Sequence, residues 1–195
     1  MTVRARNDRF ILETERLVLR RQRDDDVTFL VDLWTDPEVT RHLGGPRERD
    51  RLRTSLEETA ADPGAERFDL WPVADKAAGH LIGHCGLLDK EVEGQTEIEL
   101  VFVLAVSAWG RGYATEIGRA LCRYAFEILG ITRLIALIEL GNDASERTAA
   151  SIGMRFEREV TRSGGALRKL YAISAPPDSE PDAQLGLGDP SSKRS

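Results

Sequence analysis

Two glycines flank a cation at the point where an apolar run ends and a long amphipathic stretch begins. Residues 99–108 are mostly apolar, and Trp109, Gly110, Arg111 and Gly112 follow directly after them. A strand that turns sharply into a helix presents backbone N–H groups at the helix N-terminus, where the peptide dipoles favour an anion. The pattern therefore predicts a phosphate-binding turn over residues 109–115. The alternative interpretation is a plain strand-to-helix turn in which Gly112 only sets the geometry.

The histidines and cysteines do not have the spacing of a metal site or of a disulfide framework. His80 and His84 would share one face of a strand, and two polar strand residues are the favoured interpretation. Cys85 and Cys122 both lie in apolar contexts, which predicts buried and unreactive thiols. We therefore expect no metal.

The composition is typical of an ordinary globular protein. The chain has 195 residues, 41% of them hydrophobic and 31% charged, which favours one domain with a substantial core. A net charge of −6 argues against nucleic-acid binding and suits a cationic partner such as an amine. The sequence shows no signal peptide and no apolar run of about 20 residues, so we expect a cytoplasmic protein with no membrane partner.

The order of the predicted strands and helices around this turn indicates the fold class. Hydrophobic periodicity predicts strands over residues 16–21, 68–73, 80–88, 97–104, 132–140, 156–161 and 167–173. It predicts helices over residues 26–35, 47–61, 113–129 and 142–153, with a loop over 38–46. Pro72 implies an edge strand or a bulge. This order predicts an α+β fold, a largely antiparallel sheet with helices on its faces, rather than a Rossmann domain. We expect one domain over residues 1–174 and a disordered tail over 175–195.

Four segments in this order carry a family resemblance. They are residues 13–20, residues 36–39 followed by Gly44-Gly45, residues 109–116, and Asn142-x-x-Ser145-x-Arg147 followed by Gly153-Met154. With these motifs the chain resembles the Gcn5-related N-acetyltransferase (GNAT) superfamily, in particular the RimJ/RimL-like group that acetylates protein N-termini. Two departures stand out: Trp109 occupies the usual Gln/Arg position, and Met154 replaces the usual Phe.

The resemblance implies direct transfer of an acetyl group from acetyl-CoA to a primary amine, in a fold whose central strand splays. The backbone of Leu104, Ala105 and Val106 would hold the pantetheine arm. An N–H group near Leu104 would polarise the acetyl carbonyl, which typically contributes about 3–4 kcal/mol. Asn142 would cap the following helix and contact the pantetheine. The pyrophosphate would rest on Trp109, Gly110, Arg111, Gly112, Tyr113, Ala114 and Thr115.

Three carboxylates are candidates for removing the amine proton. Glu99 occupies a position where the RimL-like group has an acidic residue, Glu97 shares its face, and Glu139 ends the next strand. Each is also readable as a salt-bridged or solvent-facing strand residue. A strong base is not required, because an α-amine with a pKa of about 7.7–8 is partly neutral at pH 7.

Ser145 is the candidate to protonate the departing thiolate. Many members of the family use a tyrosine further along that helix, where this chain has Ser151 and Ile152. Ser145, or a water, would have to take this role. Ser145 is also readable as an ordinary residue of the first helical turn.

The acceptor is expected to be a protein N-terminal α-amine, bound by residues 36–62 and the 162–168 turn. The first of these segments is rich in arginine, which slightly favours an acceptor with acidic groups. The arginines are Arg41, Arg47, Arg49, Arg51 and Arg53. Two alternatives stay open. One is a small amine or antibiotic acceptor, such as an aminoglycoside. The other is a catalytically weak acyl-CoA-binding module. A monomer or a homodimer is compatible with the sequence.

Overall fold

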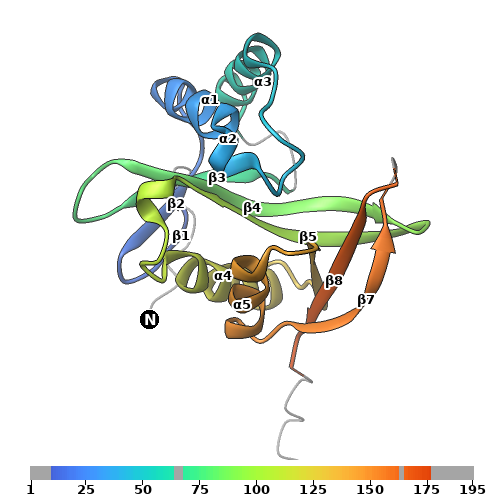
Figure 1. Cartoon of the computed structure of the whole chain (residues 1–195). Helices are drawn as coiled ribbons and strands as arrows, with labels where there is room; N and C mark the ends of the chain where they lie inside the picture. Colours follow the sequence, from blue (N-terminus) through green and yellow to red (C-terminus); the bar gives the residue numbers. More distant parts are fainter. Residues whose placement is uncertain (1–9, 64–67, 163–164, 177–195) are drawn as a thin grey trace, which may run out of the picture.

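A single twisted sheet forms the centre of the molecule in the computed structural model, which describes residues 10–63, 68–162 and 165–176 (Figure 1). Its strand order is β1-β2-β3-β4-β5-β6-β8-β7, antiparallel at each junction except the parallel pair β5 and β6. The strands are β1 (Phe10–Glu13), β2 (Leu17–Arg20), β3 (Leu70–Asp75), β4 (Leu81–Val92), β5 (Gln95–Leu104), β6 (Arg133–Glu139), β7 (Arg155–Thr161) and β8 (Leu167–Ser174).

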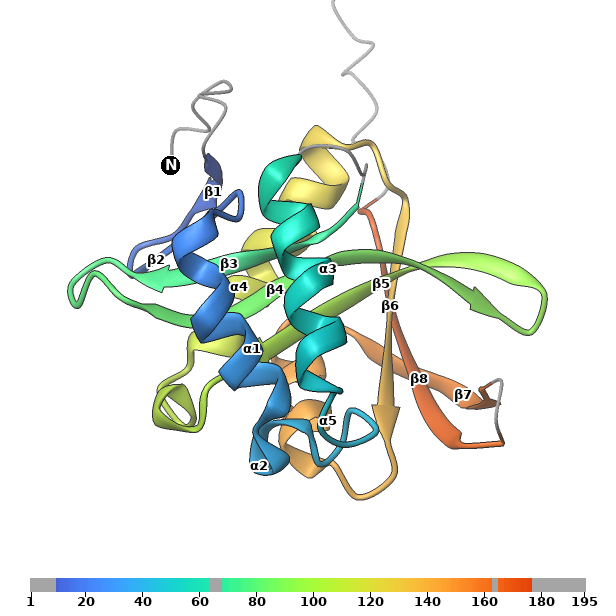
Figure 2. The same ribbon diagram turned by 90° about the horizontal axis from the view of Figure 1, so that it is seen from above.

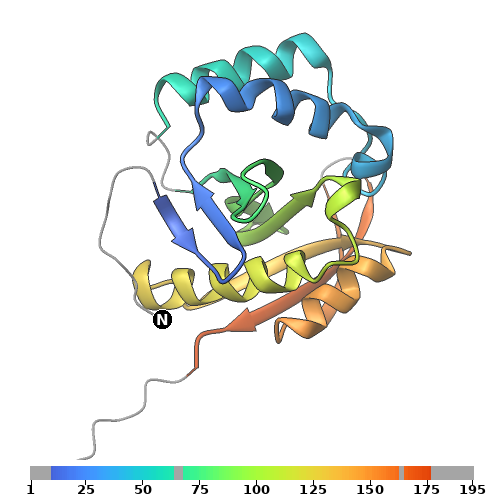
Figure 3. The same cartoon turned by 90° about the vertical axis from the view of Figure 1, so that its left-hand side faces the viewer.

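Helices cover both faces of this sheet, as the sequence predicts. Three lie on one face and two on the other (Figures 1 and 3). The first group is α1 (Val27–Thr35), α2 (Pro37–Thr40) and α3 (Arg49–Ala61), and the second is α4 (Tyr113–Arg123) and α5 (Asp143–Ser151). In the described part of the chain no helix is long and apolar enough to cross a membrane.

The two faces of the sheet have separate cores because the side chains of a strand alternate between them. Ile117 and Leu121 of α4 are fully buried in a cluster with the β-sheet residue Leu100. On the opposite face, Leu30 of α1 and Leu56 of α3 pack in a second cluster with Val103. Cys85 and Cys122 are both buried, which confirms the sequence prediction, and burial raises the pKa of the Cys85 thiol to about 12 and that of Cys122 to about 11.

The sheet splits between its two parallel strands. Glu99 and Ile135 are the only residues aligned between β5 and β6, so the strands diverge beyond this point toward the β5 C-terminus (Figure 2). On its other side β5 stays paired with β4 as far as Gly83 and Leu104. This arrangement confirms the predicted α+β fold with a splayed central strand.

Most differences from the sequence prediction are at the ends of elements. β1 is an additional edge strand, and the expected loop over 38–46 begins inside α2, which Asp36 caps by accepting from the N–H groups of Glu38 and Val39. Pro72 lies in the inner strand β3, beside a register shift between Val73 and Ala74, so a bulge rather than an edge accommodates it.

Two further predictions concern the C-terminal half. The helix expected over 113–129 is α-helical to Arg123 and then continues as a π-helical turn, Tyr124–Ile128. Of the tail expected over 175–195, only Ala175 and Pro176 are described, and the N–H of Ala175 donates to the Thr132 carbonyl (2.9 Å). The rest of that segment lies outside the described residues.

Candidate active site

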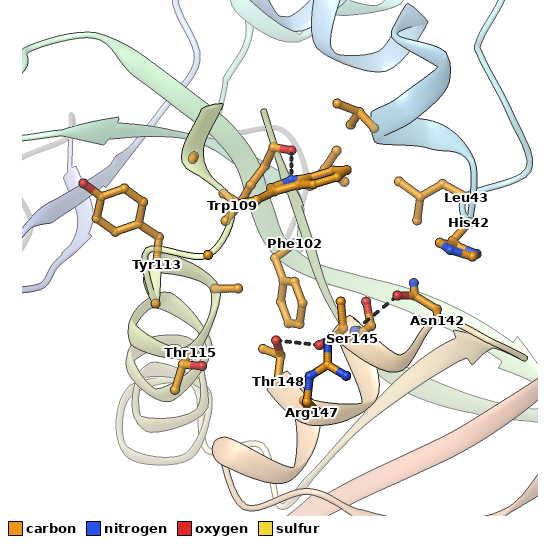
Figure 4. A pocket seen from close by; sticks show the side chains of 18 of the residues that line it. His42, Leu43, Phe102, Trp109, Tyr113, Thr115, Asn142, Ser145, Arg147 and Thr148 are labelled. Carbon is orange, nitrogen blue, oxygen red and sulfur yellow. Dashed lines mark hydrogen bonds between the residues drawn. The ribbon is translucent and has the colours of Figure 1, made fainter. Parts of the chain in front are cut away.

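A cavity of about 420 Å³ lies at the open end of the split between β5 and β6. Four segments contribute to its lining, drawn from residues 102–104 of β5, residues 108–115, residues 142–151 and residues 38–43. The cavity therefore meets the helices of both faces of the sheet. Figure 4 shows Tyr113 at one end, His42 at the other, and Trp109 and Phe102 between them, with Asn142 and Ser145 on the side formed by the start of α5.

The backbone of Leu104 points one hydrogen-bond donor into this region. Alternate residues of an antiparallel strand turn their N–H groups to opposite sides. Because Ala105 donates its N–H to the Ile82 carbonyl of the β4 side (2.9 Å), the N–H of Leu104 faces the side on which β6 has diverged. The N–H of Leu104 thus faces away from β4, whereas the N–H of Ala105 is already occupied and is not available as a donor.

The glycine-rich turn has the geometry that only glycine adopts without strain. Gly110 and Gly112 have φ values of 70° and 77°, and Gly112 is the N-cap of α4. The first helical N–H bonded within α4 is that of Glu116, so the N–H groups of Tyr113, Ala114 and Thr115 have no partner in the helix. All three residues line the cavity. An anion placed there would meet three donors and the positive end of an 11-residue helix.

Trp109 fastens this turn to the end of β5. Its indole Nε1–H donates to the carbonyl oxygen of Leu104 over 2.8 Å, and the guanidinium of Arg41 lies 5.8 Å from its ring centroid. The indole therefore connects the turn, the strand and the loop after α2. A glutamine or an arginine at this position could donate to the same carbonyl, which gives a physical reason for the replacement at Trp109.

Arg16 braces the turn from outside the cavity. Its Nη1 donates to the carbonyl of Arg111 (3.0 Å), and its Nε pairs with Glu116 (2.6 Å) in the first turn of α4. Arg111 itself is not among the cavity-lining residues, and its guanidinium lies 4.9 Å from the ring centroid of Tyr113. The structure therefore places the predicted pyrophosphate cation beside Tyr113 rather than in the cavity.

Tyr113 does not supply a free hydroxyl. Its O–H donates to the Asp75 carboxylate over 2.5 Å, which raises the pKa of Tyr113 and lowers that of Asp75. Val106, the third expected pantetheine contact, is exposed and does not line the cavity.

Asn142 and Ser145 lie together at the N-terminus of α5. The side-chain oxygen of Asn142 accepts from the backbone N–H of Ser145 (3.2 Å), so the predicted N-cap is confirmed. Both residues line the cavity, and among the described residues the Ser145 hydroxyl has no hydrogen-bond partner. A hydroxyl in this position can donate to a group bound in the cavity (Figure 4).

The carboxylates expected near the reaction centre lie in different places. Glu99 is nearly buried, 3.6 Å from the ammonium of Lys90, and burial raises its pKa. Glu97 pairs with Arg133 over 3.2 Å. Neither Glu97 nor Glu99 lines the cavity. Their carboxylates are thus joined to cations along the sheet, and a catalytic role for Glu99 stays a prediction.

Glu139 is connected to the cavity through a residue that the sequence did not suggest. Its Oε2 lies 2.9 Å from Nδ1 of His42, which lines the cavity, and its Oε1 accepts from Nη1 of Arg168 over 3.0 Å. His42 and Glu139 are 97 residues apart in the chain. The only available signal was the position of His42 between Asp36-Pro37 and Gly44-Gly45, a segment that carries the family resemblance.

A split sheet with a glycine-rich helix N-terminus at its open end is the arrangement of an acyl-group transferase. A family model described as "Acetyltransferase (GNAT) domain" matches residues 16–155, so the chain belongs to the GNAT acetyltransferases. The likeness to an uncharacterized N-acetyltransferase named p20, from Bacillus licheniformis, is 30% identity over 174 residues, which are 84% of this chain and 94% of that one.

Solved structures share this fold. An acetyltransferase of the GNAT family from Bacillus anthracis has a TM-score of 0.71 at 24% identity, covering 84% of this chain and 97% of that chain. A spermidine N-acetyltransferase from Vibrio cholerae, solved in complex with CoA and spermine, has a TM-score of 0.66 at 21% identity, covering 82% and 95%. At these identities the likeness shows the common fold.

Proposed function

We propose that this acetyltransferase moves the acetyl group of acetyl-CoA to a primary amine, with a protein N-terminal α-amine as the preferred acceptor. The observation that carries the proposal is the convergence, in one cavity, of the Leu104 N–H, the N–H groups at the start of α4 that have no partner within the helix, and the Ser145 hydroxyl. The assignment to the RimJ/RimL-like group rests on the four sequence motifs.

On the donor side, the pyrophosphate would bind the N–H groups of residues 113–115. The pantetheine would then run along β5, where Asn142 lies on the facing wall. The Leu104 N–H would donate to the thioester carbonyl, where negative charge develops as the amine attacks, and a preorganised donor of this kind contributes about 3–4 kcal/mol. Trp109 holds the carbonyl of the same peptide segment, which keeps this donor in place.

The transfer itself joins the amine nitrogen to the acetyl carbon and breaks the carbon–sulfur bond. The nitrogen loses one proton, and the thiolate of CoA gains one as it leaves. Ser145 would donate to the leaving sulfur from the wall formed by α5. Direct attack needs no covalent enzyme intermediate. It also fits the two cysteine thiols, which are buried and have raised pKa values, so they are poor nucleophiles.

Charge at the cavity supports an α-amine over a polycation. Arg41 and Arg147 line the cavity, whereas Glu38 is the only carboxylate in its lining within the described part of the chain. Polyamines and aminoglycosides carry several positive charges, which two guanidinium groups oppose. Of the five arginines expected to attract an acidic acceptor, Arg41 alone lines the cavity. Arg47 stacks over Trp34, and Arg49 pairs with Asp32.

A thiol-release assay tests this proposal. Purified protein is given acetyl-CoA and, in separate reactions, a hexapeptide with a free N-terminus and no lysine, the same peptide with a blocked N-terminus, spermidine, and an aminoglycoside. We expect turnover with the free peptide and none with the blocked one. Faster turnover with spermidine or the aminoglycoside would overturn the peptide preference. Binding of acetyl-CoA by calorimetry without turnover on any amine would instead indicate a binding module.

A further inference from the structure

We infer that His42 takes the proton from the acceptor amine, and that Glu139, itself held by Arg168, fixes the imidazole in the tautomer that this step requires. This inference rests on the proposed transfer to an amine. It assigns the base to a residue of the loop after α2, in place of the strand carboxylates that the sequence suggested.

The first step of the argument is the direction of the hydrogen bonds. An ionised carboxylate only accepts, so Nδ1 of His42, 2.9 Å from Oε2 of Glu139, must carry the hydrogen. The neutral imidazole then has its lone pair on Nε2. A carboxylate that orients a histidine in this way also stabilises the imidazolium formed when Nε2 accepts a proton.

The second step is the rigidity of the carboxylate. Nη1 of Arg168 donates to the other oxygen of Glu139 over 3.0 Å and to the carbonyl of Leu167 over 3.2 Å. Arg168 is only 8% exposed, so this guanidinium is fixed by its surroundings. Glu139 therefore cannot turn away from His42 without leaving a buried cation unpaired, which is costly.

The third step is the free nitrogen. His42 lines the cavity, its side chain is 28% exposed, and among the described residues Nε2 has no hydrogen-bond partner. Figure 4 shows its ring across the cavity from Trp109, next to Asn142. His42 and Leu104 line the same cavity, so an amine bound there can meet both groups.

His84 shows what a structural histidine looks like in the same protein. Its Nδ1 accepts from the indole of Trp34 (3.1 Å), and its Nε2 lies 3.0 Å from the Leu70 carbonyl, so both nitrogens are used and Nε2 carries the hydrogen. Its ring is buried, and burial lowers its pKa to about 4. The two residues thus have opposite tautomers, and only His42 of the two lines the cavity.

In the proposed step, the amine nitrogen bonds to the acetyl carbon while one of its protons passes to Nε2 of His42. The carbon–sulfur bond breaks, and the thiolate takes a proton from Ser145 or from solvent. The imidazolium then returns its proton to solvent. Removing a positioned general base typically costs about 10²–10⁴ in rate.

Nitrogen-15 NMR on protein labelled in its three histidines tests the tautomer without any acceptor. We expect His42, assigned by the loss of its signals in His42→Gln, to be the Nδ1–H tautomer at a pH where it is neutral. His84 is the internal control and should show the opposite tautomer. An Nε2–H tautomer at His42 would overturn the inference.

Kinetics with acetyl-CoA and the free-N-terminus hexapeptide test the role in the reaction. His42→Gln should lower kcat by about 10²-fold or more, with the KM for acetyl-CoA unchanged. His80→Gln, in an exposed turn, is the matched control and should keep wild-type turnover. Glu139→Gln should lower kcat, and the double variant should be no slower than His42→Gln, because the two residues act as a unit.

The outcomes separate the two proposals. A wild-type protein without turnover on any amine of the panel contradicts the proposed function. Turnover that survives His42→Gln within about twofold contradicts only the role of His42. Circular dichroism and thermal melting of each variant show whether a loss of rate reflects a loss of the fold.

Discussion

Among single residues, Gly112 is the one whose backbone geometry bears most directly on the proposed binding of acetyl-CoA. Its φ of 77° starts α4, and a Cβ built there would lie 3.6 Å from Arg16 Nη2. We expect Gly112→Glu to weaken acetyl-CoA binding by at least about 100-fold in calorimetry, since a carboxylate would occupy and repel the anion site.

A second glycine provides the control for this variant. Gly94, in the turn between β4 and β5, has a φ of 80° and nothing within 4 Å of an added Cβ. Gly94→Glu imposes the same backbone strain and the same charge far from the cavity, so it should bind acetyl-CoA as the wild type does. Normal binding by Gly112→Glu would remove the turn from the donor site.

Ser145 is tested by a smaller change. Ser145→Ala keeps the backbone N–H that Asn142 caps and removes only the hydroxyl. We expect a loss of about 10²-fold in kcat with little change in the affinity for acetyl-CoA. Ser55→Ala, on the exposed surface of α3, serves as the control. An unchanged kcat in Ser145→Ala would leave a water as the proton donor.

Residue types were enough to predict those features of the candidate site that depend only on neighbouring residues in the sequence. Glycine at positive φ, asparagine before a helix and cysteine in an apolar run each have a physical cause within a few residues. His42 has no such local cause. It lines the cavity and pairs with Glu139 only in the folded chain, and the sequence contains nothing that relates their positions.

Among the elements, the connection between the turn that joins β1 to β2 and the helix α4 determines how firmly the glycine-rich turn is held. Glu116 accepts from the Thr14 hydroxyl (2.5 Å) and from the backbone N–H of Arg16 (3.0 Å), in addition to its ion pair with the Arg16 side chain. Burial would raise the pKa of Glu116, but these hydrogen bonds outweigh it and lower the pKa below its ordinary value. The ionised carboxylate therefore fastens the N-terminal strands to the start of α4.

The sign of the resulting pH dependence follows from this shift. A carboxyl group whose pKa is lower in the folded state stabilises the fold above its unfolded pKa, and this stability is lost as pH falls through the folded pKa. Glu116→Gln should lower Tm by about 2–4 °C at pH 7. The difference from the wild type should shrink below about pH 4.

Thermal melts across this pH range provide the measurement for Glu116. Glu58→Gln, on an exposed part of α3, removes the same charge without these contacts and should leave Tm nearly unchanged. A Glu116→Gln difference that is the same at pH 7 and pH 3 would mean that ionisation of Glu116 does not stabilise the fold.

Element order followed from the sequence because the periodicity is clear in each main segment. β1 was not predicted because it is short and none of its residues is buried, so it has no strong apolar pattern. α2 is four residues long and depends on the Asp36 cap. The π-helical turn at Tyr124 was not predicted, because Ala125 follows Leu121 at helical spacing and is buried in the same cluster.

On the scale of the whole molecule, the site exists because the two layers of helices meet at the split. The loop after α2 belongs to one face, and α4 and α5 belong to the other (Figure 1). Motifs predict each segment, but only the packed sheet brings His42 and Glu139 together. The residues proposed for the donor side are close together in the sequence and could be suggested from it, whereas His42 and Glu139 are brought together only by the fold.

The capped carbonyl of Leu104 has a further consequence for how the molecule behaves in solution. A strand that leaves its neighbour exposes both donors and acceptors, and such an edge invites pairing with another chain. Here the indole of Trp109 occupies the Leu104 acceptor, and the adjacent N–H remains open. A strand that paired with this edge would need both the Leu104 carbonyl and the N–H. The carbonyl oxygen of a small ligand needs only the N–H. One side chain thus protects an internal sheet edge from self-association and leaves it open to a small ligand.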